Sequence, residues 1–175
     1  MPTSPIFRSL LLVALAGVLS GCASSTGQAV ARGSAAAHAA TSADSFAQTR
    51  WELTRWTAAD GTPRPLPHGN GARPIELTFL AHDDQYRVQG YAGCNRYAGT
   101  YRLQDGKLTI SAPAATRMAC PTPGLAQLER DYLNALARIQ TFTLDSGGAP
   151  RHLSFNLRDG DVLEFTRRQD PPTPR

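Results

Sequence analysis

The chain has few of the residue patterns on which metal, nucleophilic and nucleic-acid chemistry depend. Its 175 residues include three cysteines and four histidines, without a Cys-x-x-Cys or His-x-x-x-His pair, so we expect no metal site. A Gly-x-Ser-x-Gly turn for a catalytic serine is also missing, and we expect neither an enzyme nor a cofactor. The formal net charge is +4, and the arginines are scattered without a lysine-rich run. We therefore expect no nucleic acid partner.

Apolar runs long enough to cross a membrane are lacking too. The run from Leu10 to Val18 contains no polar residue, but a bilayer span takes roughly 20 apolar residues. This run follows Arg8 and precedes Leu19-Ser20-Gly21-Cys22, which completes an export signal that ends at a cysteine. We expect residues 1–21 to be a lipoprotein signal peptide. The alternative is an ordinary secretory signal in which the cysteine has no role.

Cys22 is the expected lipidation site and the expected link to the membrane. Two acyl chains would hold the mature protein durably, whereas one holds it only marginally. The next residue is Ala23 and not aspartate, which is similar to lipoproteins sorted onward to the outer membrane. We expect a lipoprotein of the outer membrane that faces the periplasm.

Two further segments are expected to stay unfolded. Residues 22–48 consist mainly of Ala, Ser, Thr and Gly with almost no large apolar side chain, so they cannot bury enough surface to fold alone. We expect a flexible tether there, and a disordered tail over the proline-rich residues 169–175.

Residues 49–168 are expected to form one folded domain, because about 120 residues support a single hydrophobic core. Apolar and polar residues alternate in short runs that end in turn residues, which is typical of half-buried antiparallel strands. Asp105-Gly106 and Asp159-Gly160 each separate two runs and predict hairpins with tight primed turns. The alternating residues include Ile75, Leu77, Phe79, Tyr86, Val88, Leu153, Phe155, Leu157, Leu163 and Phe165.

One segment has a helical period instead. After Pro123-Gly124, apolar residues recur every three or four positions up to Leu136, which predicts an amphipathic helix with Glu129 turned to water. The whole pattern predicts an α+β fold, a strand-rich antiparallel sheet or partly open barrel of about eight strands with one interposed α-helix. Residues 57–74 are rich in proline and glycine and predict a long loop.

Two stretches of this domain carry a specific signature. The first contains Gly93-Cys94-Asn95 and Gly99, and the second is Thr116-x-Met118-x-Cys120 before the predicted helix. Together they resemble the META domain, also called the HslJ-type domain of bacterial heat-shock lipoproteins, over nearly all of residues 49–167. The resemblance implies a strand-rich domain with a helix, an envelope location and an association with stress or antibiotic tolerance. It implies no established reaction.

The residue types of the signature favour a structural role. Gly93 and Gly99 permit a tight bend or a positive φ, and Asn95 tolerates such geometry as well. A disulfide between Cys94 and Cys120 would pin this bend to the segment before the helix, and closing that loop is worth roughly 3 kcal/mol on the chain-entropy model. A redox-active pair of thiols is the alternative, although the cysteines lack Cys-x-x-Cys spacing.

Two arginines lie within three residues of these cysteines. If the disulfide forms, Arg96 and Arg117 come close in the backbone and could together hold a carboxylate or phosphate. The alternative is that both are solvated or pair with a carboxylate such as Glu129. His82 with Asp83 and Asp84 could form an acid–base cluster, but these residues stand where a polar turn between two strands is expected.

The leading hypothesis is a lipid-anchored, non-enzymatic envelope protein that binds an unknown envelope partner or supports the envelope under stress. The alternative is a carrier of a small hydrophobic or anionic ligand in a partly open barrel. An acyl chain would then lie against Leu77, Phe79, Val88, Leu133 and Leu136. A hydrolase of envelope material and an inhibitor of a secreted protease remain open as further alternatives.

Overall fold

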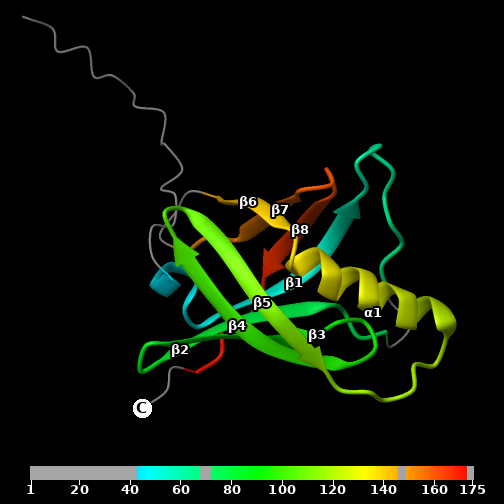
Figure 1. Ribbon diagram of the computed structural model, residues 1–175, viewed down its shortest axis with the longest axis horizontal. Coiled ribbons are helices and arrows are strands. Elements are labelled where there is room, and N and C mark those ends of the chain that lie inside the picture. The colour runs from blue at the N-terminus through cyan, green and yellow to red at the C-terminus, as the bar shows by residue number, and fades with distance from the viewer. Residues whose placement is uncertain (1–42, 68–71, 146–148, 173–175) are drawn as a thin grey trace, which may run out of the picture. The chain divides into compact units, whose positions relative to one another are not determined.

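The computed structural model describes residues 43–67, 72–145 and 149–172. Their strands form one antiparallel sheet of eight strands in the order β5-β4-β3-β2-β1-β8-β7-β6. The sheet curls until β5 and β6 lie next to each other (Figure 1), but no ladder joins them in the described part of the chain. The elements are the 3-10 helix η1 (Ala43–Phe46), β1 (Thr49–Thr57), β2 (Glu76–His82), β3 (Gln85–Tyr91), β4 (Arg96–Gln104), β5 (Lys107–Ala115), α1 (Pro123–Leu136), β6 (Ile139–Leu144), β7 (His152–Leu157) and β8 (Val162–Arg167). The predicted fold, a nearly closed barrel with one interposed helix, is confirmed.

Hairpin turns join most neighbouring strands. Asp105 and Gly106 both have positive φ (52° and 72°) between β4 and β5, as a primed turn requires. Asp159-Gly160 also lies between two paired strands, β7 and β8, but only Gly160 has positive φ. Since β7 ends at Leu157 and β8 begins at Val162, this turn is longer than the predicted one. The β2–β3 turn uses Asp83 and Asp84, again with positive φ at both.

The helix α1 begins where the sequence predicts it. Thr122 caps it, since its Oγ1 accepts a hydrogen bond from the Leu125 amide at 3.3 Å, and Pro123 occupies the first turn, where its missing N–H has no cost. The helix buries Tyr132, Ala135 and Leu136 against the barrel. Among the described residues, no helix has the length and apolar content that a bilayer span requires.

Side chains fill the interior of the barrel. Its residues are almost fully buried, with Leu77, Phe79, Leu153, Phe155 and Leu163 each at 0% exposure. Aromatic side chains contact one another edge to face, for example Phe79 and Tyr101 with ring centroids 4.9 Å apart. The inward positions are those that the alternating pattern predicts.

The folded part begins earlier than the sequence predicts, within the segment assigned to the tether. Phe46 is 0% exposed, and its ring lies 4.7 Å from Phe79 and 5.2 Å from Phe142. Thr49 donates to the Phe46 carbonyl at 2.6 Å, and Tyr101 donates to the Ala43 carbonyl at 3.0 Å. Residues 43–48 therefore belong to the domain, because one phenylalanine supplies the apolar surface that the rest of the tether lacks. The remainder of the expected tether and the signal peptide lie outside the described residues.

The C-terminal segment also extends the fold. Asp170 accepts hydrogen bonds from Arg167 at 2.7 and 3.0 Å, and from the Arg50 amide at 3.4 Å. Hydrogen bonds from Arg167 lower the pKa of the Asp170 carboxyl, and the positive charge of Arg167 lowers it further. Burial acts in the opposite direction and raises this pKa in part. The expected disordered tail thus has its first residues attached beside β1, while residues 173–175 lie outside the described part.

The described part of the predicted proline-rich loop is partly ordered. Thr57 and Pro63 form an isolated bridge, and the Arg64 guanidinium lies 4.7 Å from the Trp56 ring centroid. Arg64 also pairs with Asp131 of α1 at 3.2 Å. This part of the loop therefore contacts both Trp56 near the end of β1 and Asp131 of α1.

Candidate functional site

The Cys94–Cys120 disulfide forms, with an S–S distance of 2.05 Å. It joins the bend between β3 and β4 to the segment that leads into α1. Gly93 at this bend has a φ of +97°, which favours glycine. The predicted disulfide is confirmed, and the structural role expected of Gly93 is consistent with its backbone.

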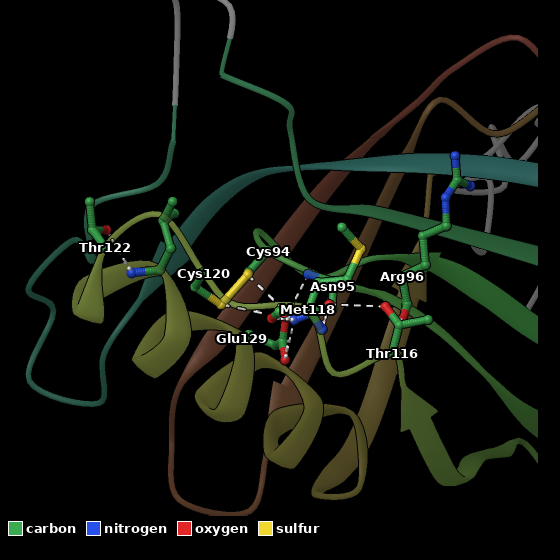
Figure 2. The surroundings of a disulfide bond; sticks show 9 residues. Cys94, Asn95, Arg96, Thr116, Met118, Cys120, Thr122 and Glu129 are labelled. Carbon is green, nitrogen blue, oxygen red and sulfur yellow. Dashed lines mark hydrogen bonds between the residues drawn. A yellow bond between two sulfur atoms is a disulfide. The ribbon is translucent and has the colours of Figure 1, made fainter.

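Asn95 has a different role from the one that the sequence predicts. It does not adopt a positive φ, and it is 3% exposed. Its Oδ1 accepts hydrogen bonds from the Met118 amide at 2.9 Å and the Thr116 hydroxyl at 3.0 Å. Its Nδ2 donates to the Met118 carbonyl at 3.1 Å. The side chain therefore binds both backbone groups of Met118 (Figure 2).

Glu129 completes this cluster from the helix. Its Oε2 accepts a hydrogen bond from the Asn95 amide at 2.6 Å, and its Oε1 accepts one from Asn95 Nδ2 at 3.3 Å. The expectation that Glu129 faces water is wrong, because the bend between β3 and β4 packs on the first half of α1 and turns its unpaired N–H toward this carboxylate. The helical periodicity of the sequence could not predict that the Asn95 amide lies beside Glu129.

Gly99 serves close packing between two strands. A Cβ at this position would lie 2.9 Å from the Ser111 carbonyl oxygen, closer than real side chains approach a backbone oxygen. The register of β4 and β5 shifts between Ala98 and Thr100. Gly99 thus permits a bulge, rather than a backbone conformation that only glycine adopts.

The segment before the helix projects from the barrel. We define residues 116–119, from Thr116 to Ala119, as the pinned loop, because Asn95 and the disulfide fix its position. All four residues are exposed, and the Met118 side chain is 72% exposed. Among the described residues, Met118 is the large apolar residue with the most solvent-exposed side chain.

A three-ligand geometry occurs at the disulfide but does not make a metal site. The two sulfurs and a Glu129 carboxylate oxygen lie within 4.8 Å of one another. Both sulfurs are bonded to each other, so no thiolate is available as a ligand.

The histidines within the described residues lie at the ends of different strands, His82 at the end of β2 and His152 at the start of β7. His82 pairs with Asp83 at 3.1 Å and His152 with Asp145 at 3.2 Å, and both imidazoles are more than half exposed. The predicted polar turn at Asp83 and Asp84 is confirmed. His68 lies outside the described residues.

The two candidate anion-binding arginines occupy different surroundings. Arg96 opens β4 and lines a hollow on the outer face of the sheet, whereas Arg117 is exposed on the pinned loop and does not line that hollow. Among the described residues, neither forms an ion pair with Glu129.

Two buried tyrosines connect the helix to the barrel. The hydroxyls of Tyr97 and Tyr132 are 3.1 Å apart, and Tyr97 donates to the Glu76 carbonyl at 3.0 Å. Burial raises the pKa of Tyr97 well above its usual value, and neighbouring Tyr132 adds to the rise. Burial also raises the pKa of Tyr132. Both hydroxyls therefore stay protonated at neutral pH and act as structural hydrogen-bonding groups.

Comparison with known proteins identifies relatives of the folded part. A family model of the META domain matches residues 44–170. No curated protein matches the chain. An NMR structure of a protein from Burkholderia xenovorans is 39% identical, covers 73% of this chain and 86% of its own, and has a TM-score of 0.64. A second NMR structure is 22% identical over 72% of this chain and 94% of its own, with a TM-score of 0.49.

Proposed function

The chain belongs to the META domain family, and on this premise we propose that it is a non-enzymatic, lipid-anchored protein of the cell envelope. The pinned loop binds a partner protein there and contributes to tolerance of envelope stress or antibiotics. The anchor is Cys22, and the location is the periplasmic face of the outer membrane. The signal-like segment before Cys22 and the family membership support these assignments.

The observation that carries the proposal is the fixed presentation of Met118. Its side chain is 72% exposed, yet Asn95 binds both its amide and its carbonyl. A partner that covers this side chain gains apolar burial without the cost of ordering the loop. Methionine suits such a contact because its thioether adapts to irregular surfaces.

The filled interior counts against the hydrophobic-carrier alternative. An acyl chain inside the barrel would have to displace Leu77, Phe79, Val88 and Leu136, each no more than 1% exposed. Packed interiors resist such insertion, because extra volume forces side chains out of their preferred rotamers. A ligand on the outer face does not face this obstacle.

The proposed function is tested by complementation in cells that lack the gene. We expect the wild-type chain to restore survival under heat and envelope-active drugs, and Met118→Asp to fail because it places a charge in the apolar contact. Thr109→Asp on β5 is the matched control, since it adds the same charge at an exposed position away from the loop. Equal rescue by Met118→Asp and wild type, with both proteins folded and equally abundant, would rule the pinned loop out as the binding surface.

The anchor is tested separately. Cys22→Ser should move the protein from the membrane fraction to the soluble periplasmic fraction and abolish labelling by a fatty-acid analogue. Unchanged labelling of the variant would contradict lipidation at Cys22.

A further inference from the structure

A hollow of about 570 Å³ lies on the outer face of β1 to β5. Its base follows one row of paired residues across five strands, Arg50, Thr78, Gln89, Ala98 and Ala114. Ala98 and Ala114 leave space at the base of the hollow because their side chains are small. We call this hollow the outer groove.

Three arginines line the outer groove, with one carboxylate among them. Glu76 pairs with Arg50 at 2.6 Å through Oε1 and with Arg73 at 3.3 Å through Oε2. The Glu76 side chain is 14% exposed, so it is largely covered by its partners. The Arg73 guanidinium also lies 4.3 Å from the Tyr91 ring centroid. Two cations are therefore held in place, and each has N–H donors left over.

The third cation of the groove is Arg96. Within the described residues the Arg96 guanidinium forms no ion pair, and its side chain extends away from the Asn95 cluster in Figure 2. Three arginines against one glutamate leave an excess of two positive charges in the lining. Thr78, Thr116 and Gln89 add neutral hydrogen-bonding groups.

We propose that the outer groove binds a small, soluble phosphate monoester. Its phosphate lies against the arginines, and its uncharged remainder covers Ala98 and Ala114. A monoester carries roughly −1.5 to −2 charges at pH 7, which matches the excess in the lining better than a single carboxylate does. The hollow lies within the roughly 300–1,000 Å³ of typical small-molecule sites, which is more space than a bare phosphate fills. This inference goes beyond the proposed function and needs neither the lipid anchor nor the exposed Met118 side chain; Thr116 is the residue of the pinned loop that lines the groove.

The experiment measures binding of glycerol 3-phosphate and glucose 6-phosphate to the full chain in detergent by calorimetry at low salt. We expect saturable binding of at least one ester at a single site. Arg96→Gln should weaken it by about tenfold or more, because it removes a charge-assisted contact. Arg117→Gln is the matched control, since it removes the same charge from an exposed residue outside the groove, and we expect a change of less than about twofold. An equal loss in both variants, or no binding of either ester, would overturn the proposal.

A second pair of variants tests shape without changing charge. Ala98→Leu fills the base of the outer groove, so we expect about tenfold weaker binding with an unchanged melting temperature. Ala119→Leu adds the same volume on the exposed pinned loop and should bind as wild type does. Wild-type affinity in Ala98→Leu would mean that the attraction is only general electrostatics.

Two further probes separate the sources of phosphate. Inorganic phosphate should bind more weakly than the ester, and equal affinity would mean that only an ion is held. Vesicles that contain phosphatidylglycerol should not compete with the ester beyond the effect of their surface charge. Binding to such vesicles that depends on Arg96, without ester binding, would assign the groove to a lipid headgroup and contradict a soluble ligand.

Discussion

The two ends of the barrel are closed in different ways. At one end Phe46 packs noncovalently on Phe79 and Phe142, and at the other the Cys94–Cys120 disulfide secures the bend against α1. Strand β4 connects these regions, since Tyr97 contacts the helix and Tyr101 contacts η1. The first end combines apolar burial with hydrogen bonds from Thr49 and Tyr101 to backbone carbonyls, whereas the second end combines a covalent bond with a polar cluster. Among the described residues, a disulfide and side-chain hydrogen bonds to a loop occur together at the second end, where they hold the pinned loop in one position.

Phe46→Ala should have the largest effect on stability, because it empties a fully buried aromatic site. We expect the free energy of unfolding to fall by about 4 kcal/mol, measured by urea denaturation. Ser45→Ala, an exposed neighbour, is the control and should change it by less than about 0.5 kcal/mol. A loss below about 1 kcal/mol in Phe46→Ala would show that the noncovalent end does not hold the barrel closed.

Replacement of Cys94 and Cys120 by alanine comes next. Loss of a bridge across 26 residues should reduce stability by about 3 kcal/mol, because the unfolded chain regains the freedom that the bridge removes. The wild-type protein under reducing conditions should lose a similar amount, and the variant should not respond to the reductant. Equal stability of the oxidised and reduced proteins would show that the disulfide does not stabilise the second end.

Asn95→Ala should cost about 2 kcal/mol, because it removes the side chain that bonds Met118, Thr116 and Glu129. Asn134→Ala on the exposed face of α1 is the matched control, and we expect it to cost nothing. If both variants unfold at the same urea concentration, the polar cluster is not what orders this end.

The smallest expected effect is the coupling between the ends. The costs of Phe46→Ala and of the double cysteine replacement should add within about 0.5 kcal/mol, since the two sites share no contact. A thermodynamic cycle over the single and combined variants measures this coupling. Values above about 1 kcal/mol would mean that the two ends form one cooperative unit and are not independent.

Residue type explains which features the sequence could predict. Alternation in the strands, the Asp105-Gly106 turn and the helix after Pro123 follow from local rules, and each is present. The Cys94–Cys120 disulfide could be predicted because cysteine is the residue type that forms such a bond. Phe46 was missed because it is a single apolar residue in a segment whose composition argues against folding.

The hydrogen bonds of the polar cluster depend on tertiary placement, which the sequence does not encode locally. Asn95 binds Met118 across 23 positions, and Glu129 reaches the bend from a helix 34 positions away. The outer groove depends on strand register, which places Arg50 and Ala98 in one row. Proximity to the cysteines suggested the pair Arg96 and Arg117, but in the structure Arg96 lines the outer groove together with Arg50 and Arg73, and Arg117 does not.

The hydrogen bonds to Asn95 order the pinned loop in the absence of any partner. Amide hydrogen exchange of the isolated, oxidised protein, resolved by NMR, tests this most directly. The Met118 amide donates to Asn95, whereas the Ala119 amide donates to no described residue. We predict that Met118 exchanges roughly 100-fold more slowly than Ala119, relative to their unfolded rates, and that Asn95→Ala removes this difference. Equally fast exchange at both amides in the wild-type protein would show that Asn95 does not preorganise the loop.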